Sequence, residues 1–141
     1  QEGKAGGWLT IWANGRVLLP DGQEDQIEAP PFPLRDIELM GQAGAFLLFG
    51  NGQVIAVGNA EPVTQSPNFG VDAARALILA GAERYLVDCT GAIHSLNGAP
   101  LLRSPHYREE DWIADAGLED SGAWWFMTRS GERLNFSPAS P

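Results

Sequence analysis

The chain has 141 residues, 44% of them hydrophobic, and its 18 acidic and 9 basic side chains give a formal net charge of −9. This length and apolar content predict a single domain, residues 1–141, with a substantial core. The acidic balance argues against sequence-independent binding of nucleic acid, which depends on Lys and Arg at the phosphates. The sequence has no apolar run of the roughly 20 residues that a membrane helix needs, and a lone Cys89 excludes a disulfide framework.

Turn dipeptides ending in glycine recur along the chain at a nearly constant spacing. Asn14-Gly15, Asn51-Gly52, Thr90-Gly91 and Ser130-Gly131 place their glycines 37, 39 and 40 positions apart. Tight primed turns need positive φ angles, which Gly and Asn supply cheaply, so such dipeptides between apolar runs predict hairpins. The predicted hairpin strands are residues 8–13 and 16–19, 45–49 and 53–57, 84–88 and 92–96, and 123–128 and 132–136.

Three of these hairpins have a further apolar run upstream, at residues 36–40, 74–80 and 111–114. The sequence therefore predicts repeats at roughly 7–20, 36–59, 74–98 and 111–136, a period typical of propeller blades and related arrays. We expect an all-β domain of four small antiparallel sheets in a compact or incomplete β-propeller-like arrangement, with closure of the ring left open. The alternative for residues 71–81 is a helix capped by Asp72 and ended by Gly81.

The connectors at residues 20–34, 59–70 and 102–110 are rich in proline and polar residues. Proline has no N–H to give to a sheet, so the segment 29–33, Ala-Pro-Pro-Phe-Pro, cannot lie inside one. Connectors of this length in a compact domain are where binding functions are commonly found.

The span from Ile37 to Asn59 resembles one blade of the regulator-of-chromosome-condensation propellers. It contains a strand, a small-residue turn, an apolar strand, Asn51-Gly52 and a strand that closes on Gly58-Asn59. Residues 76–98 repeat the pattern loosely, and Val57 stands where that family usually has tryptophan. The family's ring is about twice this length, so the resemblance implies blade-like geometry and not nucleotide exchange.

A small acidic β-repeat domain that begins with Gln1 rather than Met also resembles the periplasmic immunity proteins made against type VI secretion amidase effectors. This resemblance is one of kind, size and charge. It implies a noncatalytic inhibitor that inserts a loop into the active site of a cell-wall-degrading enzyme, in the periplasm after removal of a signal peptide. An enzyme acting on an anionic wall is commonly basic, so an acidic inhibitor is its complement.

Motifs for catalysis and metal binding are weak. Cys89 and His94 flank a hairpin turn in poor register for a nucleophile and its base, so a buried structural cysteine is the favoured interpretation. His94 and His106 lack metal-ligand spacing, and the acidic segment 21–25 departs from a calcium loop. We therefore expect no catalytic residue, no metal and no cofactor.

Tyr and Trp are enriched at binding hot spots, which directs attention to aromatic residues in the connectors and to their polar neighbours. The residues predicted to bind a protein partner are Gln65, Ser66, Asn68, Phe69, Ser104, His106, Tyr107, Glu109, Glu110 and Asp111. The acidic run 109–120 can equally be a solvated face. On a strand, Trp124 and Phe126 face one way and Trp125 the other. The alternatives are a small secreted glycan-binding module or hydrolase, and a propeller fragment that another chain completes.

Overall fold

The computed structural model describes residues 8–106 and 111–138 and is all-β. Its strands form four three-stranded antiparallel sheets, β1–β3, β4–β6, β7–β9 and β10–β12, and none of them closes on itself. The strands are β1 Thr10–Ile11, β2 Arg16–Leu18, β3 Glu24–Gln26, β4 Leu34–Met40, β5 Gly44–Phe49, β6 Val54–Gly58, β7 Ala74–Ala80, β8 Glu83–Asp88, β9 Ile93–Leu96, β10 Ile113–Leu118, β11 Trp124–Thr128 and β12 Arg133–Phe136. The predicted fold class is confirmed, and residues 74–80 form a strand rather than a helix.

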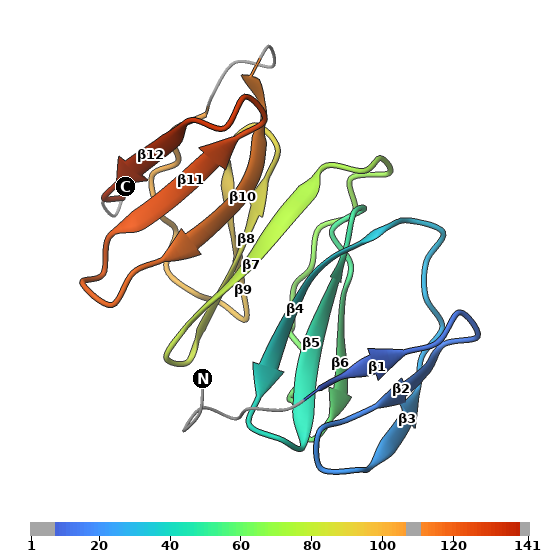
Figure 1. The fold of residues 1–141 in the computed structure, drawn as a ribbon. Helices are drawn as coiled ribbons and strands as arrows, with labels where there is room; N and C mark the ends of the chain where they lie inside the picture. Colours follow the sequence, from blue (N-terminus) through green and yellow to red (C-terminus); the bar gives the residue numbers. More distant parts are fainter. Residues whose placement is uncertain (1–7, 107–110, 139–141) are drawn as a thin grey trace.

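The four sheets follow one another in chain order, from the blue sheet at one end to the red sheet at the other (Figure 1). A separate buried cluster fills each interface between successive sheets. Strand β5 illustrates how one strand serves two interfaces. Leu47 packs with Val17 of the first sheet, whereas its neighbour Leu48 packs with Leu77 of the third. Because successive side chains on a strand point to opposite faces, a continuous apolar run can be buried on both.

The hairpins confirm the predicted positions but not the predicted turn type. The turns that end in Gly15, Gly22, Gly52, Gly91, Gly122 and Gly131 place positive φ, from 87° to 97°, on the glycine alone. In the second sheet, the amide of Gly52 donates to the carbonyl of Phe49, and the amide of Phe49 donates to the carbonyl of Gln53. This pattern is a type I turn followed by a glycine bulge. Asn51 contributes differently, because its side-chain oxygen accepts the amide of Gln53 at 3.1 Å.

Two predicted boundaries were wrong. The segment 20–34 was predicted as a connector, but it contains β3, the third strand of the first sheet. Its sequence Glu-Asp-Gln is polar, and it pairs with β2. The strand predicted at 111–114 begins at Ile113 and continues to Leu118, through a bulge between Ile113 and Asp115. The small residues of the segment 116–122 predict a turn, but Gly117 lies within β10. A Cβ there would lie 2.5 Å from the ring of Trp125, so the glycine makes room for the indole within the sheet.

Backbone hydrogen bonds join the sheets at equivalent positions, each just after a middle strand. The carbonyl of Gly50 accepts the amides of Ala73 and Ala74, and the carbonyl of Cys89 accepts the amide of Ile113, at 2.8 to 2.9 Å. Each joint thus ties the residue after one middle strand to the start of the next sheet. We call these bonds the inter-sheet joints. They fix the relative placement of the connectors between the sheets.

Candidate functional site

A groove of about 400 Å³ runs beside β9, the outer strand of the third sheet. One wall comes from the connector after β6, through Gln65, Ser66 and Pro67. The floor comes from β9, and the exposed Leu101 closes the other side. We call it the β9 groove. Connectors that are far apart in the sequence therefore meet at one sheet edge.

The backbone of β9 has unused hydrogen-bonding capacity toward this groove. The amide of Ile93 donates to the hydroxyl oxygen of Ser104 at 2.7 Å, and so points away from β8. In an antiparallel pair this direction alternates from residue to residue, so Ser95 points its amide and carbonyl the same way. Neither group of Ser95 has a hydrogen-bond partner within residues 8–106 and 111–138. Free edges of this kind can accept an extended segment as an added strand.

Several predicted partner-binding residues converge on the β9 groove. Gln65 and Ser66 line it, and the hydroxyl of Ser66 donates to the carbonyl of Gly52 at 2.9 Å. Phe69 meets the ring of His94 edge to face, with centroids 5.2 Å apart, and is half-buried rather than free. Ser104 holds the amide of Ile93. Gln65 and Ser66 therefore line the groove, whereas Phe69 and Ser104 contact its β9 residues without lining it.

Other predicted residues are not part of the groove. Asn68 uses its side-chain oxygen to accept the amide of Gly70 at 3.1 Å. His106 is exposed with a φ of 55°. Asp111 accepts the amide and hydroxyl of Ser130 at 3.1 and 2.9 Å, and these bonds lower its pKa. It therefore holds the last hairpin. Tyr107, Glu109 and Glu110 lie outside the described residues.

Cys89 and His94 do not form a nucleophile and base. The Nε2 atom of His94 lies 2.8 Å from the carboxylate of Asp88, whose pKa falls despite its burial because His94 and Thr90 hydrogen-bond to it. Cys89 is buried at an inter-sheet joint, and burial raises the pKa of its thiol. A protonated, enclosed thiol is a poor nucleophile. No cluster of three potential metal-ligating side chains occurs in the part of the chain that is described.

A second hollow, of about 360 Å³, lies where β4, β7 and β10 run next to one another. Asp36 and Glu38 come from β4, Asp115 from β10, and half-buried Trp125 from β11 completes the lining. We call it the acidic groove. Asp36 also bridges two sheets, because its carboxylate accepts the amide of Leu77 at 2.8 Å.

Burial and mutual repulsion alter ionisation in the acidic groove. Desolvation, followed by the charge of Asp36, raises the pKa of Glu38 from 4.5 to about 8. Desolvation also raises the pKa of Asp36, although the amides of Leu77 and Ile37 oppose it. The two carboxyl groups are hydrogen-bonded to each other. At neutral pH, Glu38 is therefore the protonated member and Asp36 the acceptor.

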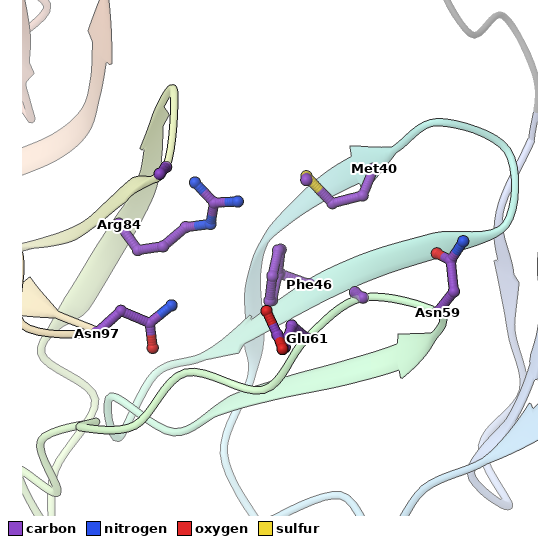
Figure 2. Close-up of a pocket in the computed structure, with 8 residues that line it drawn as sticks. Met40, Phe46, Asn59, Glu61, Arg84 and Asn97 are labelled. Atoms are coloured by element: carbon purple, nitrogen blue, oxygen red, sulfur yellow. The ribbon is translucent and has the colours of Figure 1, made fainter.

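A third cavity, of about 410 Å³, lies between the second and third sheets (Figure 2). Its lining includes Met40, Phe46, Asn59, Glu61, Arg84 and Asn97. Arg84 is only 9% exposed, and its Nη1 donates to the carbonyls of Gly81 and Glu83 at 2.6 and 2.9 Å. The guanidinium carbon lies 5.5 Å from the centre of the Phe46 ring. We call it the Arg84 cavity.

Sequence reasoning missed the last two hollows, for different reasons. Asp36 and Asp115 each precede the hairpin glycine of their unit by 16 positions. Alignment of the repeats would therefore have placed both on the first strand of their sheets, β4 and β10. Glu38 has no such counterpart. Arg84 opens an apolar strand, where a cation usually belongs to the surface. No pattern in the sequence shows that its side chain turns inward.

Comparisons of the chain with protein-family models, with curated proteins and with solved structures find no match. The all-β arrangement of four sheets therefore rests on the structure itself. Within the described residues, no helix is long and apolar enough to cross a membrane.

Proposed function

We propose that this chain is a noncatalytic protein ligand that inhibits a basic enzyme by covering its active site. The observation that carries the proposal is the β9 groove, where the backbone groups of Ser95 left unpaired within the described residues, an exposed leucine and the connector residues Gln65 and Ser66 meet. A partner loop in extended conformation can add to β9 through the backbone of Ser95 while Leu101 packs against its side chains. The net charge of −9 favours a basic partner.

The specific enzyme follows from the sequence resemblance to periplasmic immunity proteins. In this form of the proposal, the partner is a cell-wall amidase delivered by type VI secretion, and the chain protects the periplasm of the cell that makes it. The rigid sheets hold the connector after β6 in place, because the amide of Phe69 donates to the carbonyl of Asn51 at 2.8 Å. A connector fixed in advance loses little conformational entropy when it binds.

A matched pair of proline variants tests the mode of binding. Ser95→Pro removes the amide that faces the groove, whereas Asn135→Pro makes the same change at the equivalent position of β12, the outer strand of the last sheet. Proline is tolerated at a free strand edge, so both variants should fold. The enzyme recovered with the wild-type chain from the native organism serves as the ligand. We expect Ser95→Pro to weaken binding at least tenfold and Asn135→Pro to leave it unchanged.

Two results would remove the proposal: equal binding by both variants, and recovery of no enzyme. An association rate that stays flat between low and high salt would remove electrostatic steering, which salt screens. Recovery of a basic enzyme that is not an amidase would support the inhibitor proposal and contradict the resemblance to immunity proteins against amidases.

The acidic groove favours a second candidate, a glycan-binding module or hydrolase. Trp125 lines the groove, although Gly117 and Arg133 lie against its ring, and Glu38 is a protonated carboxyl at neutral pH. Glycosidases separate their two carboxyl groups by about 5 Å or more, whereas Asp36 and Glu38 are close enough for a hydrogen bond between them to contribute to their pKa shifts. For this second candidate, glycan binding is therefore favoured over glycan hydrolysis. Saturable binding of a glycan that is lost in Trp125→Ala, without a protein partner, would favour it over inhibition.

A further inference from the structure

Arg84 is held in place without using the edge of its guanidinium that usually binds carboxylates. Two backbone carbonyls occupy Nη1. The Nε atom is buried and has no hydrogen-bond partner, and Nη2 has none among the described residues either. A buried donor without an acceptor destabilises the folded state. A native structure that retains this cost calls for an explanation, such as a missing ligand.

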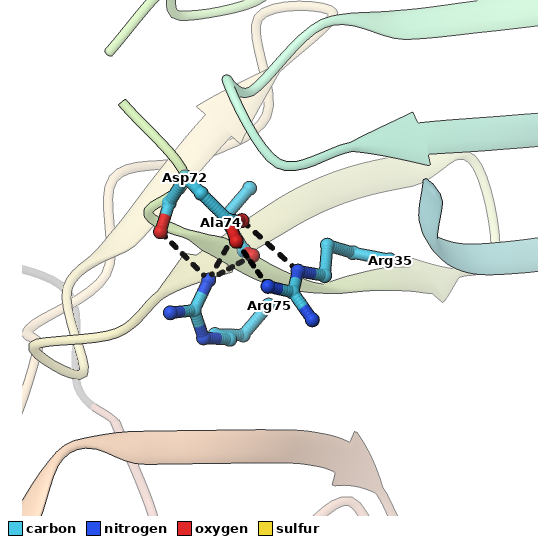
Figure 3. A network of polar contacts seen from close by, with 4 residues as sticks. All are labelled: Arg35, Asp72, Ala74 and Arg75. Atoms are coloured by element: carbon cyan, nitrogen blue, oxygen red, sulfur yellow. Dashed lines mark hydrogen bonds and ion pairs between the residues drawn. The ribbon is translucent and has the colours of Figure 1, made fainter. Parts of the chain in front are cut away.

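Other arginines of the chain show what this edge does when a carboxylate is present. Arg35 uses its Nε and Nη2 atoms to hold both oxygens of Asp72, as Figure 3 shows, and the Nε bond is 2.9 Å long. Arg16 holds Glu24 with the same two atoms, at 2.9 and 2.7 Å. This paired geometry suits the planar guanidinium better than any single bond. In Arg84 the Nη2 atom of this edge is still available to a carboxylate, whereas Nε is enclosed.

The remaining lining of the Arg84 cavity limits what the carboxylate can belong to. Glu61 also lines the cavity and has no ion pair within residues 8–106 and 111–138. Its charge would repel a simple anion but attract an ammonium group. Met40 and Phe46 supply apolar surface to the same cavity, and the guanidinium of Arg84 lies beside the Phe46 ring (Figure 2). A volume of about 410 Å³ lies at the small end of the range for ligand pockets.

We propose that the Arg84 cavity binds a free α-amino acid with an apolar side chain. Arg84 holds the carboxylate through Nη2, the one guanidinium nitrogen that is neither bonded nor buried in the described structure, Glu61 faces the ammonium group, and Met40 with Phe46 contacts the side chain. The amide groups of Asn59 and Asn97 remain to hydrogen-bond the ligand's polar end. Asn97 is already fixed, because its side-chain oxygen accepts the amide of Thr64 at 2.5 Å. The inference is independent of any partner at the β9 groove.

Leucine and its two singly capped forms test this assignment on the full chain labelled with ¹⁵N. We expect leucine to shift the amide signals of Ala60, Ala82 and Asn97 saturably, with a Kd of about 1 mM or tighter. N-acetylleucine lacks the ammonium group and leucine methyl ester lacks the carboxylate. Each should bind at least tenfold more weakly. Equal binding of all three, or no saturable shift with leucine, would overturn the proposal.

Variants separate the two charges. Glu61→Gln should weaken leucine about tenfold and improve N-acetylleucine, whereas Glu28→Gln makes the same charge change at an exposed residue outside the cavity and should alter neither. Arg84→Met should abolish the binding of leucine and of N-acetylleucine. If Arg84→Met does not fold, the response of the folded Glu61→Gln variant decides, because an unchanged preference between the two ligands contradicts the assignment.

Discussion

The two central sheets and the two outer sheets achieve burial in different ways. Strand β5 is buried along its whole length, because a neighbouring sheet covers each face. In the outer sheets only one face is covered, and the other carries a tryptophan beneath an arginine. Arg16 lies 4.5 Å from the ring centre of Trp12 and pairs with Glu24, and Arg133 lies 5.1 Å from that of Trp125 and pairs with Glu119.

Both ends of the array therefore use the same arrangement of side chains where no further sheet follows. A repeat array needs terminal units with a polar outer face to remain soluble. An aromatic ring under a paired guanidinium meets that need, because the ring covers the sheet and the charge faces water. Stability should accordingly depend strongly on the central sheets and weakly on the ends.

The largest expected effect is at the centre. Leu86→Ala empties a fully buried position of β8 and should lower the free energy of unfolding by about 2–5 kcal/mol. Leu134→Ala in β12, where the leucine is only partly buried, should cost clearly less. Urea unfolding followed by tryptophan fluorescence measures both. Equal losses would show that the outer sheet is packed as tightly as the central ones.

Substitution of the hairpin glycines tests the same difference between a central sheet and an outer sheet. Gly52 and Gly131 have φ angles of 97° and 94°, so alanine is strained at either position, by about 1–3 kcal/mol. A Cβ at Gly52 would also lie 2.6 Å from the carbonyl oxygen of Pro67, whereas a Cβ at Gly131 meets nothing within 4 Å. We expect Gly52→Ala to be the more destabilising in thermal melts. A matched loss of melting temperature would contradict this.

The acidic groove predicts a dependence on pH. The pKa of Glu38 is raised in the folded chain, so the folded state holds this proton more tightly than the unfolded state does. Stability from this group is complete below pH 4.5 and declines as the pH rises towards 8. Glu38→Gln keeps a donor for Asp36 and should gain about 1–2 kcal/mol above pH 8. A gain that is constant from pH 4 to pH 9 would refute this origin.

The smallest effect belongs to the end arrangement. The side chains of Arg133 and Glu119 are 47% and 41% exposed, so Arg133→Met should cost about 0.5–1 kcal/mol at low salt. High salt should remove part of that cost, since the ion pair is screened while the packing over Trp125 is largely kept by methionine. A loss of several kcal/mol would mean that the last sheet depends on its end more than a terminal unit should.

The sequence predicted the repeat because its signals are local. Gly91 and Gly131 mark turns that depend only on backbone conformation, and the alternation at Trp124, Trp125 and Phe126 follows from strand geometry. The sequence-based prediction failed where a residue far away in the sequence determines the local structure. Gly117 lies in a strand, and glycine is needed there because the ring of Trp125 lies over it.

The candidate sites divide in the same manner. Gln65 and Ser66 could be suspected from the composition of their connector, because polar connectors are common binding surfaces. The free edge of Arg84 could not, since it depends on carbonyls that happen to occupy Nη1. Hydrogen-bond partners of this kind are set by the three-dimensional arrangement, and one sequence holds no periodic trace of them.

The inter-sheet joints have a consequence for how such a chain can grow. Gly50 and Cys89 occupy equivalent joints with different side chains, because the bonds run between backbone groups. Tandem duplication of one unit would therefore reproduce the inter-sheet joint to its neighbour through backbone groups alone. The number of units in such an array is then free to change in evolution or by design.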